Sequence, residues 1–142
     1  MSAIPPLVIP AVRIEDVVAI MDVMDDVNPI HVDEPLAHSL GLRGRVNQGP
    51  ANLAYVINML IAWAGSPEAI AHINVRFRAI SCPDDRLEAR GEVMAVEQTP
   101  DGPLARCSFE LLRDGGELIL KGTADVRLPQ AAAETLGAVD AG

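Results

Sequence analysis

One helical segment, Ala51 to Ala64, constrains the fold more than any other feature, because it is apolar on nearly every side. Such a helix has to be buried over most of its surface. The sequence Gly65-Ser66-Pro67 follows and is expected to end it. A chain of 142 residues has room for one domain, so the rest of it must supply the cover. The apolar positions are Leu53, Ala54, Val56, Ile57, Leu60, Ile61 and Trp63.

The sequence after this segment changes to the period of β-strands. Residues 72–80 alternate between polar and apolar side chains, which predicts a half-buried strand. Three further strands are expected at 87–97, 104–113 and 117–128, and Asp114-Gly115-Gly116 is typical of a hairpin turn. Residues 4–12 contain three prolines, which suits an edge strand or an extended lead-in. We therefore predict an α+β fold, in which a curved antiparallel sheet wraps one long helix.

The remaining elements are short. Residues 14–24 carry a helical apolar stripe, and residues 34–40 predict a short helix that Gly41 ends. Between them, 25–33 is expected to be a loop, because Pro29 disfavours helix at Asn28. We predict a single domain over residues 1–129. The Ala- and Gly-rich residues 130–142 show no packing pattern and predict a flexible tail.

Composition narrows the possible partners. The net charge of −9 repels phosphate backbones and argues against nucleic acid. Apolar residues make up 49% of the chain but aromatic ones only 3%, so we expect a second subunit to complete the burial. Cys82 and Cys107 have no metal-binding spacing and are expected to be buried apolar residues. The N-terminus does not resemble a signal peptide, and residues 53–64 are too short to span a bilayer, so we predict a cytoplasmic protein without membrane contact.

Asp26 and His31 are the strongest candidates for chemistry. A carboxylate and an imidazole in one loop can hold a water molecule and move its protons near neutral pH. Asn28, between them, can fix the loop by hydrogen bonds. Two alternatives stay open on spacing alone. The carboxylates could be ordinary solvated loop residues, or Asp26, His31 and Asp33 could bind a metal, although no further Cys or His at ligand spacing supports this.

Gly49 and two pairs of arginines are further candidates. Gly49-Pro50 precedes the buried helix, whose first N–H groups are free to bind a developing negative charge, although the pair could simply start the helix. Arg76 and Arg78 share the outer face of their strand, and Arg43 and Arg45 precede the helix. These cations could bind phosphates, or they could be solvated surface residues.

Over residues 10–128 the sequence resembles the MaoC-like, (R)-specific enoyl-CoA hydratases, which have the hotdog fold. The resemblance rests on Asp26-Val27-Asn28-Pro29-Ile30-His31-Val32-Asp33, followed by Ala37, Gly41 and Gly49 ahead of a long helix. It implies a dimer or larger hotdog oligomer, and a catalytic water activated by Asp26 and His31. It also implies that the Gly49 N–H stabilises the oxygen of an acyl thioester, with no metal or bound cofactor.

The sequence departs from the family at two places. Met24-Asp25 stands where members usually have Ser-Gly, and Gln48 stands where they usually have His. We expect Gln48, with Asn28, Arg76 and Arg78, to bind substrate, and the departures to alter substrate preference. Residues 46–67 also resemble the small subunits of actinobacterial steroid side-chain hydratases. Three functions therefore stay open: an enoyl-CoA hydratase, a 3-hydroxyacyl-carrier-protein dehydratase, and a partner-dependent subunit of a hetero-oligomer.

Overall fold

The computed structural model describes residues 2–141 and contains one five-stranded antiparallel sheet with strand order β1-β3-β4-β5-β2. The strands are β1 (Ser2–Ile9), β2 (Ile70–Phe77), β3 (Leu87–Thr99), β4 (Gly102–Arg113) and β5 (Glu117–Arg127). The helices are α1 (Ile14–Met24), α2 (Glu34–Ser39), α3 (Gly49–Ala64) and α4 (Gln130–Ala141), with short 3-10 turns at Pro29–His31 and Pro67–Ala69. As predicted, the strand with the prolines lies at a sheet edge.

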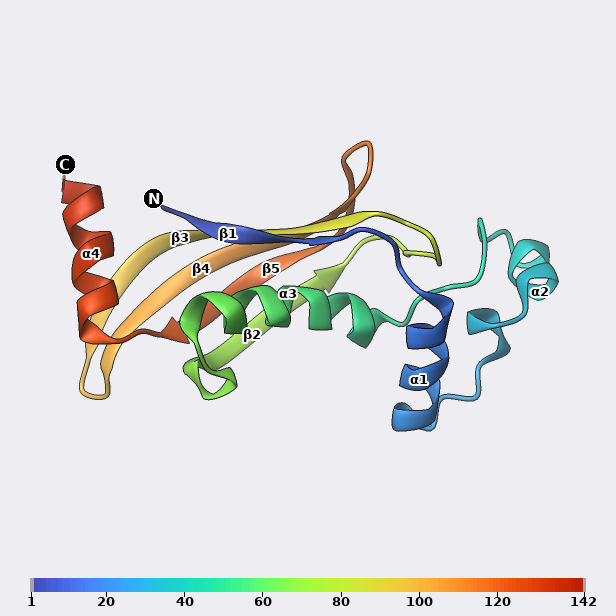
Figure 1. The fold of residues 1–142 in the computed structure, drawn as a ribbon, viewed down its shortest axis with the longest axis horizontal. Coiled ribbons are helices and arrows are strands. Elements are labelled where there is room, and N and C mark those ends of the chain that lie inside the picture. Colours follow the sequence, from blue (N-terminus) through green and yellow to red (C-terminus); the bar gives the residue numbers. More distant parts are fainter. Residues whose placement is uncertain (1, 142) are drawn as a thin grey trace.

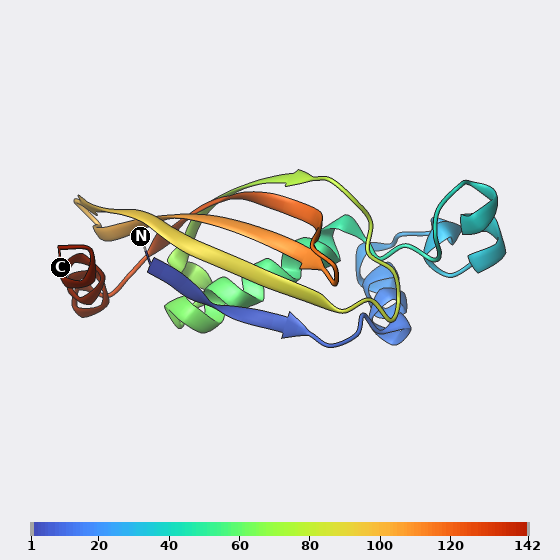
Figure 2. The same ribbon diagram turned by 90° about the horizontal axis from the view of Figure 1, so that it is seen from above.

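Helix α3 runs along one face of the sheet, which curves around it (Figure 1, Figure 2). Its residues Val56, Met59 and Leu60 are at most 1% exposed. They pack with the inward residues of all five strands, among them Ile4 and Leu111. The predicted hotdog arrangement of a helix wrapped by an antiparallel sheet is therefore confirmed, and the mostly apolar surface of α3 explains it.

The structure differs from the sequence predictions at several element ends and over the C-terminal residues. Helix α3 begins at Gly49 rather than Ala51, and β2 ends at Phe77 rather than Ile80. Residues 130–141 form helix α4, where a flexible tail without a packing pattern was expected. Alanine-rich sequence favours helix once part of it can pack, and here Ala133 is 5% exposed while Leu136 packs against the core. No helix within residues 2–141 has the length and hydropathy needed to cross a membrane.

The segment between β1 and α3 projects beyond the end of the sheet. Figures 1 and 2 both show α1 beside the start of α3, with α2 further out. We call this segment, residues 10–48, the arm. Several apolar side chains of this region are exposed, including Val23 (82%), Val27 (84%) and Leu40 (61%). The loop at residues 25–33, which carries the candidate acid/base residues, lies in this arm.

Both cysteines are buried and free, as predicted. Burial raises the pKa of the Cys82 thiol, and it raises the pKa of Cys107 to about 12. A thiol reacts as its thiolate, and a raised pKa keeps the thiol protonated until the pH exceeds that value. We therefore expect iodoacetamide at pH 8 to label the folded chain at least about a hundredfold more slowly than the urea-unfolded chain. Mass spectrometry counts the labels; rapid labelling of Cys107 without urea would contradict its burial.

Candidate active site

Asp26 and His31 are in direct contact. The Oδ2 atom of Asp26 lies 2.9 Å from Nε2 of His31. The imidazole is buried, with 7% of its side chain exposed, whereas the carboxylate is 28% exposed. The pair thus has a fixed inner member and an outer member that solvent or a ligand can reach.

The loop sequence explains how the two side chains meet. Oδ1 of Asp26 accepts a hydrogen bond from the Asn28 N–H at 3.0 Å, and the Asn28 side chain accepts one from the Ile30 N–H at 3.2 Å. Pro29 then begins a 3-10 turn that ends at His31. Two successive side-chain caps and one tight turn therefore bring His31 back towards Asp26. Asn28 itself is exposed and acts as a cap; its expected contact with substrate stays a prediction.

The backbone of Val46 sets the tautomer of His31. Nδ1 of the imidazole lies 2.6 Å from the Val46 carbonyl, and the Val46 N–H donates to the Ile30 carbonyl at 3.1 Å. A carbonyl can only accept, so Nδ1 carries a proton. The short contact between Nε2 and Asp26 then requires one further proton, shared between an imidazole nitrogen and a carboxylate oxygen. The arrangement can therefore take up and return a proton at Asp26.

Gly49 is the first residue of α3. It lies three residues after Val46, whose carbonyl contacts His31. A side chain at Gly49 would meet the ring of Phe77, whose nearest carbon lies 3.3 Å from the position of a Cβ atom. Phe77 closes β2 and is 51% exposed. The first N–H groups of α3 therefore lie beside a half-exposed aromatic wall, where a ligand oxygen can approach backbone donors.

Gln48 is buried rather than presented to solvent. It is 3% exposed, and its Nε2 donates to the Val17 carbonyl of α1 at 2.9 Å. Its Oε1 is buried and has no hydrogen-bond partner among the described residues. The side chain therefore ties the start of α3 to α1, and its expected part in substrate binding stays a prediction.

Asp25, the other departure from the expected pattern, has a backbone explanation. It caps α1 with a φ of 51° in the left-handed region. Glycine adopts this region freely, and Asp is among the residues that tolerate it. Asp33 does not join Asp26 and His31 as a ligand, because it caps α2 by accepting from the Leu36 N–H at 3.0 Å. Within residues 2–141 no three His, Cys, Asp or Glu side chains are grouped to hold a metal.

The two arginines that we expect to bind substrate, Arg76 and Arg78, lie at and just beyond the end of β2. Arg76 lines a groove on the outer face of the sheet with Asn74 and Lys121, whereas α3 covers the inner face. Arg78 follows β2 and is exposed. Their role in binding phosphate stays a prediction.

Sequence reasoning missed two contributors to the site. Val46 acts through its carbonyl, which leaves no signal in its side-chain type, and it lies 15 residues from its partner His31. Phe77 left a weak signal, because the alternation at residues 72–80 places it on the face of the strand opposite Arg76. That face is the helix side, and the closeness of the Phe77 ring to Gly49 agrees.

Comparisons with known proteins agree with the fold. A family model described as the MaoC like domain matches residues 11–102. The fold is similar to the R-hydratase PhaJ1 from Pseudomonas aeruginosa, with a TM-score of 0.77 and 20% identity over 89% of this chain and 79% of that one. A structure described as a MaoC-like dehydratase gives 0.81 and 23% over 89% of this chain, but only 39% of that longer chain. The ChsH1-ChsH2 complex from Mycobacterium tuberculosis gives 0.77 and 18%, over 90% of this chain and 96% of that one. No curated protein matches.

Proposed function

The chain belongs to the MaoC-like domain family, and from this premise we propose that it is an enoyl-CoA hydratase of the (R)-specific type. It adds water across a trans-2-enoyl-CoA thioester and gives a 3-hydroxyacyl-CoA. The observation that carries the proposal is the 2.9 Å contact between Asp26 and His31, together with the Val46 carbonyl that fixes the imidazole. Hydration requires a group that takes a proton from water and returns one to carbon, and this pair has that capacity.

The chemistry balances on the pair without another reactant. One O–H bond of a water molecule at Asp26 breaks, its oxygen forms a bond to Cβ of the enoyl group, and its proton passes to the pair. The pair gives a proton to Cα, so that it regains its starting state. The electron pair of the double bond moves towards the thioester carbonyl in between, and the Gly49 N–H at the start of α3 is the donor proposed for that oxygen.

Exposed cationic and apolar side chains support the binding partners that we propose for this reaction. Arg76 and Arg78 are the cations we propose for the CoA phosphates. The exposed apolar residues of the arm, such as Val23 and Val27, support a second subunit that covers it. The similarity to the ChsH1-ChsH2 complex favours one further candidate, a subunit that acts only with a different hotdog chain. A CoA thioester as substrate fits the cytoplasmic location that the sequence predicts.

An assay with purified protein tests the proposal. We expect the absorbance of the enoyl thioester of crotonyl-CoA, or of a bulkier trans-2-enoyl-CoA, to fall with time and protein concentration. Faster turnover of a carrier-protein thioester would identify the 3-hydroxyacyl-carrier-protein dehydratase instead. Activity that appears only with a co-expressed hotdog homologue would identify the partner-dependent subunit. No turnover under any of these conditions would contradict a hydro-lyase.

A further inference from the structure

The Val46 carbonyl, which fixes His31, is itself held by a second peptide group. The Val46 carbonyl and the Asn47 N–H belong to one planar peptide unit. The Asn47 N–H donates to the Ser81 carbonyl at 2.8 Å. The direction of the carbonyl that faces His31 is therefore set from the connection between β2 and β3, some 35 residues along the chain from Val46.

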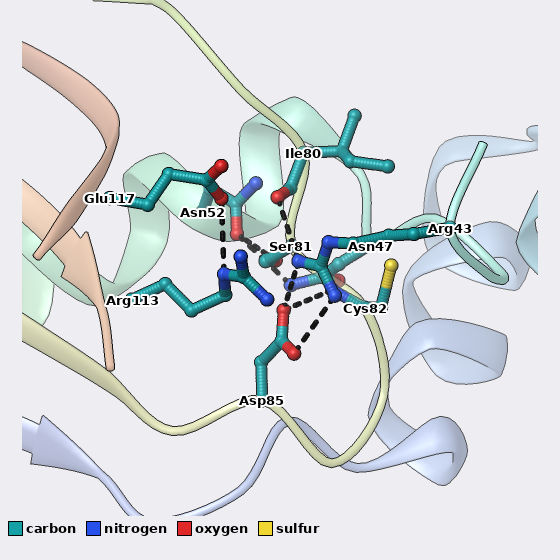
Figure 3. A network of polar contacts seen from close by, with 9 residues as sticks. All are labelled: Arg43, Asn47, Asn52, Ile80, Ser81, Cys82, Asp85, Arg113 and Glu117. Carbon is teal, nitrogen blue, oxygen red and sulfur yellow. Dashed lines mark hydrogen bonds and ion pairs between the residues drawn. The ribbon is translucent and has the colours of Figure 1, made fainter. Parts of the chain in front are cut away.

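The second peptide unit ends on a carboxylate. The Ser81 carbonyl and the Cys82 N–H share one plane, and that N–H donates to Oδ2 of Asp85 at 2.8 Å. Figure 3 shows the Asp85 carboxylate facing the Arg43 guanidinium, whose Nη1 donates to Oδ1 at 3.0 Å. The side chain of Asp85 is 12% exposed. A partly buried ion pair, with the Arg43 side chain 34% exposed, thus terminates a line of hydrogen bonds that begins at the imidazole.

Every bond of this line points the same way. His31 donates to Val46, the next N–H donates to Ser81, and the N–H after that donates to Asp85. Hydrogen bonds in such a chain polarise one another, and a carboxylate at the end strengthens the acceptors before it. The Val46 oxygen that receives the imidazole proton is therefore both aimed and made a better acceptor by Asp85.

Neighbouring contacts hold the line in place. Nη2 of Arg43 also donates to the Ile80 carbonyl at 3.2 Å, which fixes the peptide before Ser81. The hydrogen bond to Asp85 raises the pKa of Arg43, so the cation persists. The Ser81 hydroxyl donates to Oδ1 of Asn52 on α3 at 2.6 Å, and the Asn47 side chain donates to the same oxygen at 3.2 Å (Figure 3). Asn47, Asn52 and Ser81 are all at most 3% exposed.

We propose that Asp85 is a positioning residue, which orients the imidazole of His31 through the peptide groups 81–82 and 46–47. The inference rests on the proposed function, since it gives His31 a role in hydration. Asp85 contacts no reacting atom in this scheme. It holds the Nδ1 proton of His31 in place, so that Nε2 stays directed at Asp26.

The experiment replaces Asp85 and follows both turnover and the imidazole. For Asp85→Asn we expect kcat to fall about tenfold while KM changes by less than about twofold, because orientation rather than substrate binding is lost. The chain has three histidines, and His38 and His72 are exposed, so the ring ¹⁵N signals of His31 can be assigned by replacing the other two. We expect the Nδ1 proton of His31 to exchange with solvent about tenfold faster in the variant.

Two further variants separate positioning from mere loss of an ion pair. Glu117→Gln removes the neighbouring Arg113–Glu117 pair, a 3.0 Å contact in the same region of Figure 3, and should leave kcat and the exchange rate unchanged. Arg43→Gln keeps the carboxylate and should raise the exchange rate less than Asp85→Asn does. Equal effects of Asp85→Asn and Arg43→Gln would overturn the proposal, as would an unchanged exchange rate. Should Asp85→Asn fail to fold, an exchange rate of Arg43→Gln equal to that of Glu117→Gln would overturn it.

The two proposals fail in different ways. If the wild-type protein hydrates none of the thioesters, the proposed function is wrong, whatever Asp85 does. If the wild-type protein is active and His31 exchange does not respond to Asp85, the function stands and the positioning role is wrong.

Discussion

Replacing Asp26 with asparagine, or His31 with alanine, is expected to lower kcat for enoyl-thioester hydration by about 10²–10⁴. Asparagine retains an oxygen for the Asn28 N–H but cannot accept a proton from water. Alanine at position 31 leaves Asp26 without the partner 2.9 Å away that shares its proton. Because each member acts through the other, we expect the double variant to lose little more than either single one. Initial rates at saturating substrate measure the effect.

His38→Ala provides the matched control for this prediction. His38 is exposed in the same arm and has a carboxylate, Glu34, at 3.8 Å, so it is a histidine–carboxylate pair without burial or a fixed tautomer. Its removal should leave kcat within about twofold of the wild type, as surface changes usually do. Wild-type rates for a folded Asp26→Asn or His31→Ala variant would rule out the acid/base role of the pair.

The fold was predictable where a pattern extends over many residues. The apolar surface of residues 51–64 requires burial on most sides, and only a sheet that curves around the helix provides it in a chain of this length. The alternation at residues 72–80 and the Asp114-Gly115-Gly116 turn predicted strands that the structure confirms. The helix at residues 130–141 was missed because its stabilising contacts, through Ala133 and Leu136, are with distant parts of the chain.

In the candidate site, too, features made by local contacts could be predicted, and features made by distant contacts could not. The sequence from Asp26 to His31 could be interpreted because its caps act over two residues each and bring the pair together within the loop. The Val46 carbonyl and its support from Ser81 could not be found, since both act through backbone atoms that every residue has. The direction of the Gln48 side chain could not be predicted either, because its amide nitrogen donates to the distant Val17 carbonyl of α1. Only tertiary packing decides that direction.

Gly122→Ala is expected to cause the largest loss of stability among single substitutions at the glycines of the sheet. A Cβ atom at this position would lie 2.0 Å from the Asn74 carbonyl oxygen of β2 and 2.7 Å from the Phe109 ring. Backbone of a paired strand cannot move aside without breaking the β2–β5 ladder, in which Gly122 faces Val75. We expect the free energy of unfolding to fall by about 3 kcal/mol, a large part of the about 5–15 kcal/mol typical of a domain. Urea unfolding followed by Trp63 fluorescence at one fixed protein concentration measures it.

Gly91→Ala is the control, because it adds the same methyl group to the same face of the same sheet. There a Cβ atom would meet the side-chain ends of Met59 at 3.0 Å and Ile4 at 3.1 Å, which can shift by a few tenths of an ångström. The expected loss is about 1 kcal/mol. Since β2 carries Phe77 to the start of α3, the Gly122 variant should also lose activity at a lower temperature than the Gly91 variant. Equal unfolding midpoints for the two variants would contradict the prediction. They would show that the paired backbone of β2 and β5 accommodates a methyl group at no greater cost than flexible side chains do.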